Sequence, residues 1–122
     1  MAVTSFFYGN AFVSAFNGLI DFDTDTIKVA LCTSSYTPAQ DTHDFFNDVT
    51  NEVSGTGYTA GGATLASASI TYTGGTNVLK LDGADTSWTT STITARYAVI
   101  YKSTGTAATS PLIAYVDFGA DV

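Results

Sequence analysis

Period-two alternation of apolar and polar side chains is the feature that most limits how this chain can fold. It is clearest over residues 92–102 and recurs over residues 26–33 and 66–73, as in strands with two unlike faces. The glycine-rich segment 74–77 separates two such stretches and has the length of a hairpin loop. The pattern predicts a mainly β domain, either an antiparallel β-sandwich or a barrel.

The length and charge of the chain exclude several classes of protein. Its 122 residues fit a single domain, 1–122, whose β-rich parts are expected at 26–33 and 63–118. Four basic residues against eleven acidic ones give a net charge of −7. So few cations cannot follow a phosphate backbone or an anionic membrane surface, which argues against nucleic acid and membrane partners. No apolar run approaches the length of a membrane span, and the first residues lack the basic region of a signal peptide.

The N-terminal residues have helical spacing. Over residues 5–17 the apolar side chains recur every three or four positions, with a stop signal at Asn17 and Gly18. This predicts one short helix packed over the sheet. We expect Phe12 with Phe16, or Phe7 with Phe12, to be buried against the apolar face of the strand at 26–33. That face consists of Ile27, Val29 and Leu31.

The last apolar run, residues 111–118, is apolar on both faces, as in a central strand. A central strand needs a neighbour on each side, and the sequence ends four residues later at Val122. Either an earlier strand or another chain must supply that neighbour. We expect another chain, and therefore an oligomer or a protein ordered within a larger assembly.

A single cysteine, Cys32, and a single histidine, His43, leave few routes to catalysis. They exclude an intrachain disulfide and every two-histidine metal motif. Cys32 is expected to be a small buried hydrophobe. His43 could act as a base or metal ligand beside Asp41, Asp44 and Asp48, but an exposed histidine beside capping acids is the favoured interpretation. We expect no catalytic residue and no cofactor.

Three alternating carboxylates, Asp21, Asp23 and Asp25, match the start of a calcium-binding loop. The rest of such a loop is missing, because Thr26 and Cys32 occupy the positions that require glycine and glutamate. The run is therefore predicted to be an acidic turn before a strand, and no metal site is expected.

Five residues are candidates for an interface. Arg96 and Lys102 share the outer face of the strand at 92–102; Arg96 could form a salt bridge across the sheet or dock on an acidic partner. Trp88 could be a core or interface aromatic, or could stack on a sugar. Ile113 and Tyr115 form the second apolar face of the last run.

Five segments together resemble a family of small structural proteins of tailed bacteriophages, encoded near the head genes. They are residues 6–17, 27–38, 40–46, 51–62 and 93–101, of which 51–62, NEVSGTGYTAGG, is the most specific. The resemblance extends over essentially the whole chain. It implies a component of the virion and transfers no catalytic residue.

Three functional classes follow. The favoured one is a non-enzymatic capsid decoration protein on the outer surface of the virion, which bridges major capsid subunits and associates with copies of itself. Its net charge of −7 would keep it away from packaged DNA. The alternative is a receptor- or glycan-binding module of a tail or head fibre, with Trp88 facing the glycan. A hydrolase is the least favoured class, because the chain has one histidine and one cysteine.

Overall fold

The computed structural model describes residues 2–89 and 91–122. Met1, in the predicted domain, and Thr90, in the predicted β-rich part 63–118, lie outside these ranges. Within them the chain is mainly β, as predicted, with seven strands, one α-helix and two 3-10 turns. The elements are β1 Thr4–Phe7, α1 Gly9–Phe16, β2 Ile27–Cys32, η1 Phe46–Asp48, β3 Ala63–Thr64, β4 Ser69–Thr73, β5 Val78–Asp82, β6 Tyr97–Lys102, η2 Ala107–Thr109 and β7 Leu112–Asp117.

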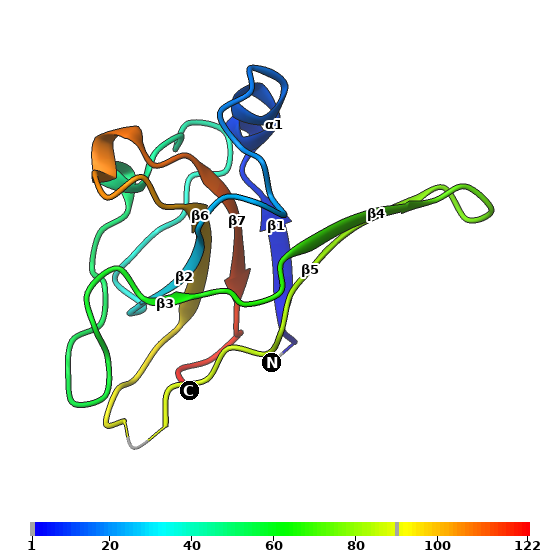
Figure 1. Ribbon diagram of the computed structural model, residues 1–122. Coiled ribbons are helices and arrows are strands. Elements are labelled where there is room, and N and C mark those ends of the chain that lie inside the picture. The colour runs from blue at the N-terminus through cyan, green and yellow to red at the C-terminus, as the bar shows by residue number, and fades with distance from the viewer. Residues whose placement is uncertain (1, 90) are drawn as a thin grey trace.

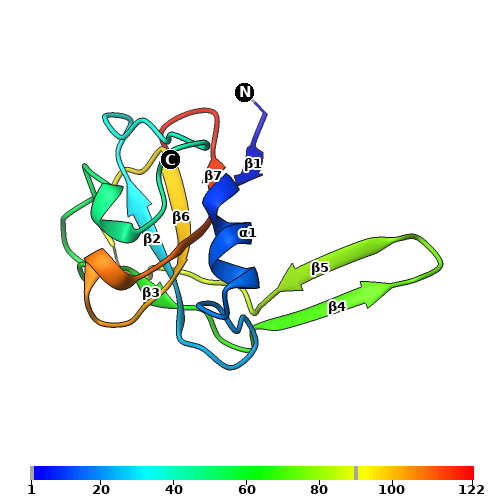
Figure 2. The ribbon, with the colours of Figure 1, turned by 90° about the horizontal axis from the view of Figure 1, so that it is seen from above.

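Two antiparallel sheets make up the described part of the chain (Figure 1). Five strands form the body in the order β1-β7-β6-β2-β3, while β4 and β5 pair only with each other. Loops and α1 cover the faces of the larger sheet, and the β4–β5 hairpin projects away from it (Figure 2). The arrangement is sandwich-like, and in the described residues the larger sheet does not close into a barrel.

Strand β7 is central, as its two apolar faces indicated, but its second neighbour comes from the same chain. β1 pairs antiparallel with β7 from Thr4 opposite Asp117 to Phe7 opposite Ala114. On the other side, β6 pairs with β7. The expectation that another chain must cover β7 is therefore wrong. Residues 4–7 carry two aromatics beside a threonine and suit a strand as well as a helix.

Helix α1 is shorter than the predicted helix and buries a different face. Its buried residues are the small Ala11 and Ser14, whereas Phe12 is 50% exposed and Phe16 90% exposed. Phe7, now in β1, is 42% exposed. The predicted burial of these phenylalanines is wrong. Tyr8 sets the rotation of the helix, because its side chain is fully buried and its N–H donates to the Ile113 carbonyl at 3.0 Å.

Both faces of the larger sheet carry buried clusters, whereas every residue of the edge strand β1 is exposed. One face, which we call the tyrosine face, packs Tyr8, Tyr36 and Tyr101 around Val99 and Leu112. The opposite face, the aliphatic face, has two clusters. These clusters include Phe22, Ile27, Leu31, Val53, Ala98 and Ile113. The apolar face predicted for the strand at 26–33 lies here: Ile27 and Leu31 are buried and Val29 is half-buried.

Candidate interaction surface

The β4–β5 hairpin, which we call the arm, has one apolar face. Ile70 lies opposite Leu81 and Tyr72 opposite Leu79, so these four side chains share a face of the two-stranded ribbon. The other face carries hydroxyls, Val78 and a Lys80–Asp82 ion pair. Every residue of β4 is exposed, as is every residue of β5 except Leu81, which is half-buried.

Residues 74–77 close the arm as the glycine-rich sequence predicts. Asn77 adopts the left-handed conformation with φ 57°, which asparagine tolerates better than most residues. The Tyr72 hydroxyl donates to Asn77 Oδ1 at 3.1 Å and ties the apolar face to the turn. The arm is therefore a defined ribbon with a specific end.

Three exposed phenylalanines lie near the base of the arm. The rings of Phe7 and Phe12 are 5.4 Å apart, and Phe16 follows one helical turn after Phe12. A hollow of about 310 Å³ separates this aromatic group from the base of the arm, where Leu79 and Leu81 form part of its wall. Its lining is almost entirely apolar.

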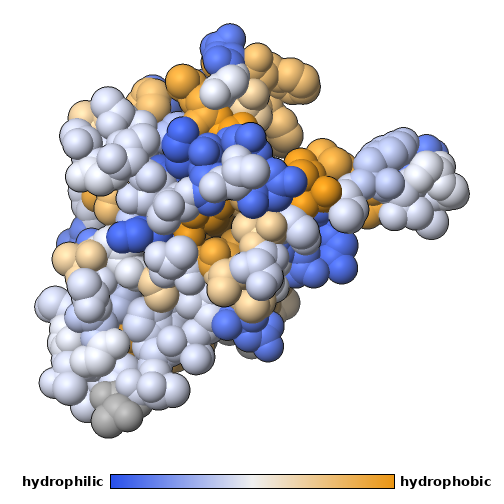
Figure 3. All heavy atoms as spheres, viewed as in Figure 1, coloured by the Kyte–Doolittle hydropathy of each residue, from blue (hydrophilic) through white to orange (hydrophobic). Residues whose placement is uncertain are grey.

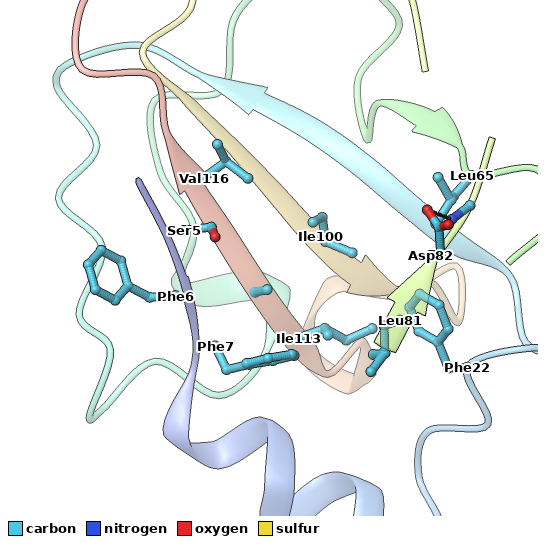
Figure 4. Close-up of a pocket in the computed structure, with 12 residues that line it drawn as sticks. Ser5, Phe6, Phe7, Phe22, Leu65, Leu81, Asp82, Ile100, Ile113 and Val116 are labelled. Carbon is cyan, nitrogen blue, oxygen red and sulfur yellow. Dashed lines mark hydrogen bonds between the residues drawn. The ribbon is translucent and has the colours of Figure 1, made fainter. Parts of the chain in front are cut away.

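A second hollow, of about 420 Å³, lies on the aliphatic face of the sheet. Figure 4 shows the Phe7 side chain turned toward Ile113 and the Phe6 side chain directed away, as their alternate positions in β1 require. The two hollows adjoin, since both are lined by Phe7, Phe22, Leu81 and Ile113. We call the pair the apolar groove. Figure 3 shows hydrophobic surface beside α1 and at the base of the arm.

Of the two candidates in the last apolar run, one lies in the groove. Ile113 is 4% exposed and forms part of its floor. Tyr115 lies on the tyrosine face, with its ring 5.5 Å from Phe6 and 5.1 Å from Tyr8. The two residues therefore lie on different faces of the sheet, and the prediction that they share one face is wrong. The register of β6 against β7 shifts here, because Ile100 pairs with Ala114 and Tyr101 with Leu112, so Ile113 is an extra residue that breaks the alternation.

The two cationic candidates already have partners in this chain. Arg96 Nε donates to Asp117 Oδ1 at 2.7 Å, the salt bridge that was one of its two interpretations. This hydrogen bond holds the pKa of Asp117 below its ordinary value. Lys102 Nζ lies 3.2 Å from Asp25 and donates to the Leu19 carbonyl at 2.8 Å. Docking on an acidic partner would require both side chains to leave these contacts.

Trp88 belongs to the edge of the core. It is half-buried, with its ring 6.1 Å from Tyr58, and it packs against the cluster that contains Leu31 and Val53. The residues lining the apolar groove do not include it. Trp88 is therefore not part of the apolar groove and is partly covered by its own chain.

The lone cysteine and histidine sit among buried tyrosines. Cys32 is fully buried, and burial raises the pKa of its thiol to about 12, which confirms the prediction of a buried hydrophobe. His43 is half-buried, so the exposed-histidine interpretation is wrong. Its Nδ1 accepts from the Ala39 N–H at 3.3 Å and lies 3.0 Å from the Tyr36 hydroxyl. The Tyr36 hydroxyl in turn lies 2.8 Å from that of Tyr8.

The acidic residues of the two loops serve local structure. The Asp25 carboxylate accepts the Asp21 N–H at 2.7 Å, and Asp48 accepts the Asp44 N–H at 3.0 Å. In residues 2–89 and 91–122, no group of three or more His, Cys, Asp or Glu side chains is placed to hold a metal ion. No helix of the same residues combines the length and the apolarity that crossing a membrane requires.

The groove is the feature that sequence reasoning missed. Its walls come from β1, α1, the loop at Phe22 and the arm, which are brought together only by the fold. The sequence signal that could have indicated it was the pair Ile70 and Tyr72, which share one apolar face of a predicted strand, residues 66–73, that contains no charged residue. Comparison of the chain with models of protein families, with curated proteins and with solved structures finds no match.

Proposed function

We propose that this chain is a non-enzymatic structural protein of a tailed-bacteriophage virion, a decoration protein that bridges major capsid subunits on the outer surface of the head. The observation that carries the proposal is the apolar surface formed by the groove and the arm, which is typical of a component of an assembly, whether this surface contacts capsid subunits or other copies of the chain. Monomeric proteins rarely expose contiguous apolar patches beyond a few hundred Å², and larger patches mark contacts with other molecules. The resemblance of residues 51–62 to phage structural proteins agrees with this role.

The distribution of charge supports an assembly role on the outside of a particle. Residues 4–20, which contain β1 and α1, include no Asp, Glu, Lys, Arg or His, although the whole chain carries a net charge of −7. An uncharged contact surface can be buried without the cost of desolvating ions. The remaining surface is acidic, and packaged DNA would repel it.

The fold also suits a protein that must keep its shape within a particle. The central strands of the larger sheet pack against buried clusters on both faces. The Arg96–Asp117 ion pair fixes one end of β7, and the Leu112 N–H, which donates to the Asp44 carbonyl at 2.9 Å, fixes the other end. A rigid sheet of this kind presents a contact surface with little ordering cost on binding. The hydroxyl-rich loops around it can add hydrogen bonds at the rim of an interface.

Copy number and location on the particle test this proposal. We expect quantitative mass spectrometry to find the chain in amounts comparable with the major capsid protein, and electron microscopy to place it on the outside of the head. Particles that lack it should lose DNA at a lower temperature, and purified protein added back should restore their stability. A few copies at the tail would favour the glycan-binding alternative, and absence from the particle would overturn both.

A further inference from the structure

We propose that the arm of one copy of this chain binds in the apolar groove of a second copy. The proposal goes beyond capsid decoration and does not rest on it, because the contact forms between purified copies of the chain. Three observations carry it: the uncovered face of the arm, the area of apolar surface, and the absence of net charge on both surfaces.

The arm lacks a core of its own. A two-stranded ribbon is at best marginally stable in water, and more strands or a packed apolar face are needed to hold it. The base of the arm reaches its own body, where Leu81 is half-buried and Leu79 lines the hollow beside α1. Leu79 is still 57% exposed, Tyr72 is 63% exposed, and the ribbon extends away from the larger sheet (Figure 2). A second molecule is therefore needed to cover its outer half.

The exposed apolar area approaches that of a stable dimer contact. Phe7, Phe12, Phe16 and Tyr72 are 42%, 50%, 90% and 63% exposed. At roughly 200 Å² for each aromatic side chain, they leave about 500 Å² uncovered. Leu79 and other exposed aliphatic side chains enlarge this area further. A standard interface buries about 800 Å² on each partner.

Charge favours another copy of the chain as the occupant. Two molecules of net charge −7 repel each other, and this repulsion is smallest when the surfaces that meet are free of acidic residues. Asp82 is the one charged residue among those that line the groove, and it forms an ion pair with Lys80. The arm, residues 69–82, holds no other charged residue than this pair. Lys80 and Asp82 lie on the polar face of the arm, whereas Leu79 lies on its apolar face. A cationic partner would instead bind to the acidic surface of the protein outside the groove and the arm.

An exchange of arms uses both surfaces of each copy. In a two-fold pair, the first copy places its arm in the groove of the second and receives the second arm in return, so both apolar surfaces of each copy are buried. Tyr72 and Leu79, paired across the ribbon, would then face Phe12 and Phe16 of the other copy. Aromatic and aliphatic contacts of this kind dominate the energy of protein interfaces.

Neighbouring residues of β5 provide a matched pair of variants. Leu79 is 57% and Val78 51% exposed, yet their side chains lie on opposite faces of the arm. By sedimentation velocity at micromolar concentration, we expect the wild-type chain to be a dimer. Leu79→Thr should raise the dissociation constant at least about tenfold, and Val78→Thr should change it by less than about twofold. Circular dichroism checks that each variant keeps its fold.

A mixing experiment separates arm exchange from general hydrophobic association. Tyr72→Thr impairs the apolar face of the arm at a residue that does not line the groove. Phe16→Ala impairs the groove without touching the buried core, since Phe16 is 90% exposed. Each variant alone loses both contacts of the dimer. In the mixture, the intact arm of the Phe16→Ala copy meets the intact groove of the Tyr72→Thr copy. The mixture should therefore associate more tightly than either variant alone.

Three results would overturn the inference. The first is a wild-type chain that stays monomeric at about 100 µM, a concentration at which even weak specific pairs form. The second is an equal rise of the dissociation constant in Val78→Thr and Leu79→Thr, and the third is a mixture of Tyr72→Thr and Phe16→Ala that associates no more tightly than either variant alone. Failure here is distinct from failure of the proposed function. A monomer that still binds and stabilises capsids would sustain decoration alone, and a dimer that does not bind them would sustain arm exchange alone.

Discussion

Two apolar residues with opposite exposure test the packing of the sheet. Leu112 is fully buried on the tyrosine face, so Leu112→Ala should lower the free energy of unfolding by ~2–5 kcal/mol. Phe16 has only a tenth of its side chain covered, because it is 90% exposed. At roughly 200 Å² per ring and ~25 cal/mol per Å², its burial contributes about 0.5 kcal/mol. The higher helix propensity of alanine offsets most of this loss.

Urea and thermal unfolding followed by circular dichroism measure both effects. The protein is kept dilute, because association would add stability that depends on concentration. With ~4 °C lost per kcal/mol in a domain of this size, Leu112→Ala should melt ~8–20 °C lower and Phe16→Ala within ~2 °C of the wild type. A loss above ~2 kcal/mol for Phe16→Ala would show that α1 buries its aromatic face, as its sequence spacing predicts.

Three further measurements probe buried and paired groups. Burial raises the pKa of Tyr8, and it raises the pKa of Tyr36 to about 12. The free energy of unfolding should therefore fall as pH rises above about 10, where tyrosine ionises in the unfolded chain. Ultraviolet absorbance should show both hydroxyls ionising only as the circular dichroism signal is lost. The Arg96 hydrogen bond lowers the pKa of Asp117. The ion pair therefore stabilises the fold above about pH 4, and this stabilisation is lost as pH falls through the lowered pKa. In Asp117→Asn the free energy of unfolding should depend less on pH in this acid range. Because burial raises the pKa of Cys32 to about 12, a thiol reagent at neutral pH should label it only in denaturant, and rapid native labelling would contradict its burial.

Local patterns were sufficient to predict the strands whose partners lie close in sequence. The arm was predicted because its alternation and the turn at residues 74–77 act within a single hairpin. The strand at residues 26–33 was predicted from its own period-two pattern and was found as β2. The predicted strand at 92–102 is shorter in the structure, β6 at Tyr97–Lys102, because Ala95 bonds to Val122 and Thr92 to Thr56, which lie outside the strands of the larger sheet.

Features that depend on distant contacts could not be predicted in the same way. Phe7 fits a helical stripe as well as a strand, and only its pairing opposite Ala114 decides between them. The rotation of α1 follows from the burial of Tyr8, whose hydroxyl bonds to Tyr36 far along the chain. His43 is half-buried for the same reason, since its partner is Tyr36. Such contacts leave no periodic signal in the sequence.

The pairing of β1 with β7 also has a consequence for the order of folding. Thr4 lies opposite Asp117, so this contact closes a loop of nearly the whole chain, at an entropic cost of about 4 kcal/mol. Hairpins such as β4–β5 and β6–β7 close much shorter loops and can form earlier. Until β1 arrives, one edge of β7 is open to pairing with other chains. The strand that is synthesised first is therefore expected to complete the sheet last.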